Sequence, residues 1–250
     1  MNLGLSGKVA LVTGGANGVG REIALALAAE GATVAVNYRS SSEAARAVVA
    51  EIAAGGGTAI GVGADVADFG AVKAMVARVV DELGGLDILV NNAGVALRQR
   101  FAETTPEDWR RQIDVCLYGA IHCCHAAAPH LEKSGDGRII ALIGDSSRVG
   151  ESGLAIVAAA RAGVIGLVKS LAKEFGRFGT TANVVSLGLV ETAHDRDWVE
   201  ANRERLVRLY PLRRLGQAGD VAPMVTLLAS AGGGWITGQV ISISGGFSMV

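Results

Sequence analysis

The chain contains few of the residues that mark several protein classes. Only 3 of its 250 residues are cysteine, 4 are proline, and 4% are aromatic. The cysteines, Cys116, Cys123 and Cys124, have no paired spacing, which excludes a disulfide framework and favours a reducing cytoplasm. The 23 basic and 24 acidic residues leave a net charge of −1. We therefore expect neither a nucleic acid nor a membrane as a partner.

Long hydrophobic runs and targeting signals are also lacking. The first residues contain no basic stretch followed by an apolar run, so we expect no signal peptide and a cytoplasmic protein. The most apolar stretch, residues 154–171, is interrupted by Arg161 and Lys169, which favours a buried helix or a subunit contact over a membrane span. No group of His, Cys and acidic residues has metal-ligand spacing, so we expect no metal.

The sequence instead alternates short β-branched runs with longer Ala-rich segments of helical period. Half of the residues are hydrophobic. Near-continuous apolar strands that alternate with helices are typical of a parallel sheet covered on both faces. The pattern predicts an α/β fold, a Rossmann-type doubly wound sheet. We expect strands at residues 8–13, 32–37, 59–62, 86–91, 138–143, 181–186 and 239–243, and helices at residues 20–30, 42–54, 68–83, 106–131, 157–178 and 220–229.

No linker and no internal repeat divides the chain. The alternation predicts one nucleotide-binding domain over residues 1–250. A charged segment of helical period, residues 195–209, interrupts the alternation. We interpret it as part of a small substrate lid near residues 193–212.

A glycine-rich segment follows the first expected strand directly and opens the first helix. It contains Gly14, Asn17, Gly18, Val19 and Gly20. Glycines permit a tight turn and close approach of the backbone to a pyrophosphate, while the helix N-terminus offers N–H groups and a positive dipole. The context favours dinucleotide binding over a merely structural turn.

The second strand ends without a carboxylate that would accept a hydrogen bond from the adenosine ribose of NAD. Arg39 lies there instead, and an arginine can pair with the 2′-phosphate of NADP. The sequence therefore favours NADP(H) over NAD(H). The alternative interpretation of Arg39 is a solvated surface side chain.

These motifs resemble the short-chain dehydrogenase/reductase family, in its simple single-domain form, along nearly the whole chain. The resemblance implies about seven strands and a homo-oligomer, either a tetramer or a dimer, that acts on a small-molecule substrate. It also implies further cofactor contacts, which are Asp65 and Val66 after the third strand, Asn92, Ala93 and Gly94 after the fourth, and Thr192 beside the nicotinamide.

The same resemblance locates four positions that are usually catalytic, and all four are changed. The family's Tyr-x-x-x-Lys positions are occupied by Val157 and Arg161, its Ser position by Gly144 and its Asn position by Cys116. Valine has no proton to donate, and arginine cannot be deprotonated in a protein. The usual tyrosine mechanism is therefore excluded at these positions.

The polar residues left near this site are the candidates for chemistry. We predict catalytic roles for Arg161, Asp145 and Ser146, with Arg161 also able to contact the cofactor. Asp145 would be an acid of raised pKa if it were buried beside the nicotinamide. The alternative is that Asp145 caps its turn or pairs with Arg148. Cys116 is interpreted as a small core residue, not as a nucleophile.

Three functional hypotheses follow. The favoured one is an NADP(H)-dependent oxidoreductase that transfers hydride without the usual Tyr, Lys, Ser and Asn, to an enone or to an enoyl or alicyclic thioester. The second is an inactive NADP(H)-binding protein. The third is a redox-neutral lyase or isomerase that uses Asp145 or Glu151 as its acid–base group.

Overall fold

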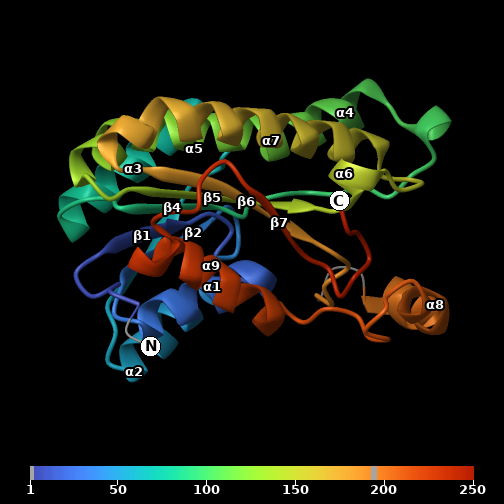
Figure 1. The fold of residues 1–250 in the computed structure, drawn as a ribbon, viewed down its shortest axis with the longest axis horizontal. Helices are drawn as coiled ribbons and strands as arrows, with labels where there is room; N and C mark the ends of the chain where they lie inside the picture. Colours follow the sequence, from blue (N-terminus) through green and yellow to red (C-terminus); the bar gives the residue numbers. More distant parts are fainter. Residues whose placement is uncertain (1–2, 193–195) are drawn as a thin grey trace.

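The computed structural model describes residues 3–192 and 196–250. In these residues one sheet of seven parallel strands has the order β3-β2-β1-β4-β5-β6-β7 (Figure 1). The predicted Rossmann-type doubly wound sheet is confirmed. The strands are β1 (Val9–Val12), β2 (Thr33–Tyr38), β3 (Ala59–Gly63), β4 (Ile88–Asn91), β5 (Arg138–Gly144), β6 (Thr181–Leu187) and β7 (Val240–Ile243).

The order of the strands reverses direction at β1, which lies between β2 and β4. The four residues of both β1 and β4 are buried, as expected for central strands covered on both faces. In such sheets, ligands bind outside the carboxyl ends of the strands where the order reverses. The turns after β1 and β4 are therefore the first place to look for a site.

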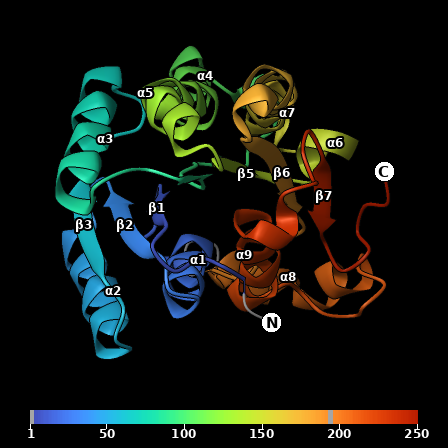
Figure 2. The same ribbon diagram turned by 60° about the vertical axis from the view of Figure 1, so that its left-hand side comes forward.

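Helices cover the two faces of the sheet in separate layers. Figures 1 and 2 show α3 (Phe69–Leu83), α5 (Gly119–Ser134) and α7 (Ala155–Phe175) on one face. The other face carries α1 (Gly18–Ala29), α2 (Ser42–Ala54) and α9 (Ala218–Ala229). Each layer encloses its own hydrophobic core with alternate strand residues, since neighbours along a strand point to opposite faces.

The predicted helix at residues 106–131 is not one regular α-helix. It consists of α4 (Pro106–Ile113), a π-helical turn η2 (Asp114–Tyr118) and then α5. Cys116, in the family's Asn position, lies within this turn, and π turns are frequent at functional sites. The prediction also missed α6 (Ser146–Val149), and short 3₁₀ turns add η1 (Phe101–Glu103), η3 (Gly176–Phe178) and η5 (Ala231–Gly233).

Among the described helices, one is long and apolar enough to cross a membrane by length and composition alone, over Ala155–Phe178. A core helix passes the same test. This helix packs against β5 and β6, and Val157, Val164 and Val168 on its inner face are buried. It is a core helix of this fold.

The charged segment forms α8 (Arg196–Arg208) at one end of the molecule, on the side of α9 (Figure 1). Val199 and Leu206 of α8 pack with Tyr210 and Leu215 in a small core of their own. Residues 193–195 of the predicted lid lie outside the described residues. The lid function of this segment stays a prediction.

Candidate functional site

The turn after β1 is held in place by its neighbours on both sides. Gly14 and Gly18 have φ of +61° and +52°, which side-chain-bearing residues rarely adopt. On the β2 side, the buried Asn37 accepts from Gly14 N at 3.1 Å and donates to the carbonyls of Val62 and Ala64 at 3.2 and 3.1 Å. The Asn37 side chain thus joins the turn after β1 to the end of β3.

On the β4 side, the same turn packs against the segment that begins with Asn92. The Asn92 amide donates to Thr13 O at 2.9 Å and Gly14 O at 3.2 Å, and Thr13 Oγ1 accepts from the backbone of Asn92 and Ala93. A Cβ on Gly20 would lie 2.4 Å from both Asn92 Nδ2 and Gly14 O. Only glycine fits at position 20.

The N-terminus of α1 faces the space that this turn encloses. No acidic residue lies in its first turn, and the Asn17 side chain makes no capping hydrogen bond. The N–H groups and positive dipole of the helix are therefore available to an anion. The geometry fits the pyrophosphate of a dinucleotide.

One cleft of roughly 870 Å³ runs along the carboxyl ends of the strands from this turn. Every residue that the sequence assigned to the cofactor lines it. They are Gly14, Asn17, Gly18, Val19, Gly20, Arg39, Asp65, Val66, Asn92, Ala93, Gly94, Arg161 and Thr192. Their individual contacts with a nucleotide stay predictions.

The adenosine end of the cleft contains a cation with only a weak partner. The Arg39 guanidinium lies 4.0 Å from the Asp65 carboxylate, and both side chains are substantially exposed. Such surface pairs are worth about 1 kcal/mol or less. Ser40 and Ser41 line the same end, so two hydroxyl donors lie near the arginine. The sequence interpretation missed these two serines.

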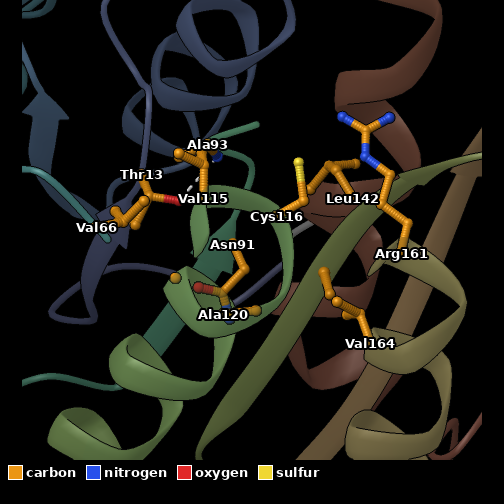
Figure 3. A pocket seen from close by; sticks show the side chains of 12 residues that line it. Thr13, Val66, Asn91, Ala93, Val115, Cys116, Ala120, Leu142, Arg161 and Val164 are labelled. Carbon is orange, nitrogen blue, oxygen red and sulfur yellow. Dashed lines mark hydrogen bonds between the residues drawn. The ribbon is translucent and has the colours of Figure 1, made fainter. Parts of the chain in front are cut away.

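Arg161 reaches the opposite end of the cleft from α7. Figure 3 shows its side chain extending past Leu142 and Cys116. Its Nη2 lies 2.6 Å from where a Cβ on Gly94 would be, so the guanidinium rests on a backbone without a side chain. Among the described residues, none accepts a hydrogen bond from this guanidinium or pairs with it. A half-buried fork of N–H donors is left open to a ligand.

Gly144 leaves a space at the end of β5 on which two donors converge. The point where its Cβ would lie is 3.3 Å from Ser146 Oγ and 3.4 Å from Arg161 Nη1. Ser146 is 7% exposed, and no described residue forms a hydrogen bond with its hydroxyl. The Ser146 hydroxyl and one amino group of Arg161 therefore border the same space beside Gly144.

Asp145 does not fit either of its predicted structural roles. It makes no side-chain cap, and Arg148 donates to the Ser242 hydroxyl instead of the Asp145 carboxylate. Asp145 Oδ1 accepts from Ser186 and, at 3.2 Å, from Ser242. The residue is 1% exposed, and its carboxylate is held by serines of β6 and β7 behind the site, while Ser146 lies next to Gly144 of the cleft lining.

Three other residues considered from the sequence, Cys116, Val157 and Glu151, do not line the cleft. Cys116 is 6% exposed and packs with Val157 and Ala160, while its thiol donates to Val95 O at 3.2 Å and accepts from Val95 N at 3.4 Å. Val157 is 1% exposed. Glu151 pairs with Arg98 at 2.7 Å.

Tyr210 is not among the residues that the sequence pattern assigns to the site. It lies outside any Tyr-x-x-x-Lys motif, yet its hydroxyl accepts from Leu189 N at 2.7 Å, next to the cleft wall. This hydrogen bond joins two residues that are 21 positions apart in the sequence, and no local sequence pattern predicts it.

Replacing Gly20 with Ala should weaken NADPH binding. The added Cβ collides with the Gly14 backbone and with the Asn92 amide, so the turn is displaced from the geometry that binds the pyrophosphate. Restoring that geometry on binding costs about 1–3 kcal/mol, which corresponds to a loss of roughly 5- to 150-fold in affinity. Calorimetric titration with NADPH measures this.

The matched control is Gly166→Ala on α7, where nothing lies within 4 Å of the new Cβ. It should bind as the wild type does. Equal affinity in the Gly20 and Gly166 variants would contradict the packing argument.

Comparison with known proteins agrees with this geometry. The family described as Enoyl-(Acyl carrier protein) reductase matches residues 14–248. The chain is 42% identical over 242 residues to the 3-oxoacyl-(acyl-carrier-protein) reductase FabG of Staphylococcus aureus, covering 97% of this chain and 98% of that protein. It is 36% identical over 247 residues to (2S)-((R)-hydroxy(phenyl)methyl)succinyl-CoA dehydrogenase subunit BbsD of Thauera aromatica, covering 99% of both.

A solved dehydrogenase/reductase from Sinorhizobium meliloti superposes with a TM-score of 0.93 at 36% identity, covering 99% of this chain and 98% of that one. Sequence and architecture therefore agree over the same length. The chain belongs to the short-chain dehydrogenase/reductase family of NAD(P)(H)-dependent oxidoreductases.

Proposed function

We propose that the protein is an NADP(H)-dependent reductase of enoyl thioesters, with Arg161 and Ser146 as the groups that bind the substrate oxygen. The observation that carries the proposal is the convergence of Ser146 Oγ and Arg161 Nη1 on the space at Gly144. The proposal includes one domain with a substrate lid near residues 193–212 and a cytoplasmic location, which the sequence pattern predicts, and the homo-oligomer that the family resemblance implies.

The donors present suit an enolate better than an alkoxide. When bound, the nicotinamide supplies a hydride, which an enoyl thioester accepts at its β-carbon. Arg161 and Ser146 stabilise the negative charge that moves onto the thioester oxygen. Water then protonates the α-carbon to give the saturated thioester. No protein acid at the position of Val157 is required, whereas ketone reduction needs a proton on oxygen.

The relatives support a thioester substrate. The relatives at 42% and 36% identity are named for an acyl-carrier-protein substrate and a CoA substrate, which are both thioesters. The family description itself refers to enoyl reduction. The alicyclic thioesters and enones that the sequence suggested belong to the same proposal, because they also give delocalised enolates.

The choice of NADP(H) rests on Arg39. Its guanidinium is held only by a 4.0 Å contact with Asp65, and Ser40 and Ser41 line the same end of the cleft. A 2′-phosphate would receive charge-assisted hydrogen bonds there. Asp65 is the only acidic residue among the described residues that line the cleft, and the family resemblance assigns it to adenine.

The two other hypotheses have less support. A redox-neutral reaction through Asp145 or Glu151 requires one of them to face the cleft, but Asp145 is buried behind it and Glu151 is paired with Arg98. An inactive nucleotide-binding protein would not require two unpartnered donors to meet at Gly144.

The first test is the Arg161→Ala variant. Loss of an oxyanion donor typically lowers kcat by about 10²–10³, so the variant should lose that much enoyl-CoA reduction, measured as NADPH oxidation at 340 nm. Lys169→Ala, an exposed change on the same helix, should retain the wild-type rate.

Gly144→Ser probes the same space without changing Arg161. Its side chain would fill the position on which the two donors converge, so kcat should fall while nucleotide affinity is retained. The proposal fails if the wild type oxidises no NADPH with any enoyl thioester at high enzyme concentration. It also fails if Arg161→Ala is fully active.

Arg39→Ala tests the cofactor. A charge-assisted contact of about 1.5–3 kcal/mol predicts a 10- to 150-fold loss of NADPH affinity with no change for NADH. Arg46→Ala, an exposed arginine on α2, is the control and should affect neither. Parallel loss of both cofactors would exclude recognition of the 2′-phosphate by Arg39.

A further inference from the structure

Residues 187–192 form a partition between two cavities. The cofactor cleft lies on one side, where Leu187, Gly188, Val190 and Thr192 line it. A second cavity of roughly 480 Å³ lies on the other side and shares Gly188 and Val190 with the cleft. The partition therefore has open space behind it and needs fixed points to hold it against the cofactor.

The cofactor side of the partition must be accurately placed. Thr192 Cγ2 lies 3.4 Å from where a Cβ on Gly18 would be, so the segment packs onto the glycine-rich turn. The family resemblance assigns Thr192 to the nicotinamide.

Backbone pairing holds the partition near both ends. Gly188 N donates to Ile243 O at 3.2 Å, Glu191 N donates to Gly216 O at 2.9 Å and Leu189 O accepts from Gly216 N at 3.0 Å. The N–H of Leu189 is bound by a side chain instead, since it donates to the Tyr210 hydroxyl at 2.7 Å.

Tyr210 is itself rigidly placed. It is 4% exposed, and its ring stacks on Phe247 with centroids 5.4 Å apart. The ring also packs on backbone, because a Cβ on Gly188 or Gly245 would lie 2.9 or 3.4 Å from it. Burial is the largest cause that raises the pKa of Tyr210, so its hydroxyl stays protonated at neutral pH.

We infer that Tyr210 is a positioning residue for the nicotinamide half of the cofactor, acting through its hydrogen bond to Leu189 N. It follows α8 directly, and Tyr210 N donates to Val207 O at 3.1 Å. The hydrogen bond thus connects the proposed lid to the partition. Without the hydroxyl, the Leu189 N–H loses its partner, and the partition gains freedom to move into the cavity behind it.

The test is the Tyr210→Phe variant, with binding measured by calorimetry for NADPH and for 2′,5′-ADP. The second ligand has the adenosine and its phosphates but no nicotinamide. Loss of one buried hydrogen bond predicts about tenfold weaker NADPH binding, while 2′,5′-ADP affinity stays within twofold. Circular dichroism and melting temperature report on folding.

Two controls separate the hydroxyl from general destabilisation. Tyr118→Phe removes a hydroxyl from a half-exposed ring, and Ile139→Val destabilises β5 at the end remote from the site. Neither should separate the two ligands. The inference is overturned if Tyr210→Phe binds NADPH as the wild type does, if it loses both ligands equally, or if it does not fold.

The inference rests on the nucleotide-binding part of the proposed function and not on its chemistry. A wild type that binds both ligands but reduces no thioester refutes the chemistry and leaves Tyr210 testable. A wild type that binds neither ligand overturns both.

Discussion

The arrangement of the site depends on one close contact, between the turn after β1 and the segment after β4. Thr13 and Asn92 join them with four hydrogen bonds from two side chains, and Gly20 leaves no room for a side chain between them. Because β1 and β4 are adjacent parallel strands, this contact also places the N-terminus of α1 beside the segment after β4 that contains Gly94. The pyrophosphate end and the Arg161 end of the cleft are thereby set by the same few atoms.

The sequence predicted what local patterns encode. Short β-branched apolar runs located all seven strands, and segments of helical period located most helices, to within a few residues, because a strand buried on both faces is apolar throughout and a helix buries one face. The π-helical turn at Asp114–Tyr118 and the four-residue α6 were missed, since neither is long enough to show a period. The glycine-rich turn was located because a strand, the glycines and a helix follow one another directly.

Local patterns could not predict the details of the site, because these depend on atoms brought together from distant segments. The sequence named Arg161 and Ser146 as candidates, but their convergence at Gly144 depends on how α7 and α6 pack against the end of β5. The role of Asp145 depended on whether it lies beside the nicotinamide, and the structure shows its carboxylate bound to Ser186 and Ser242, which are distant in the sequence. Tyr210 gave no signal at all, since its partner is a backbone N–H.

The changes at the family's catalytic positions are physically connected. Arg161 Nη1 approaches within 3.4 Å of the Cβ position at Gly144, so a serine there would compete with the guanidinium for the same space. Gly94 is equally required, because Nη2 rests 2.6 Å from its Cβ position. The Arg161 guanidinium is accommodated because β5 ends at Gly144, which has no side chain. Under the proposed function, one donor set replaces another and the site is not simply emptied.

The proposed donor Ser146 follows Asp145 in the chain, and the Asp145 carboxylate is bound inside the fold. Its Oδ1 accepts from Ser186 of β6 and Ser242 of β7, while Arg148 of α6 donates to Ser242. The carboxylate and the guanidinium thus share a serine hydroxyl instead of pairing directly, and three neighbouring strands are joined to the turn that carries Ser146. Asp145 Oδ2 is buried with no described partner, an arrangement that costs stability. A cost of this kind is expected where a polar network fixes the geometry of a site, because an apolar residue would pack without orienting α6.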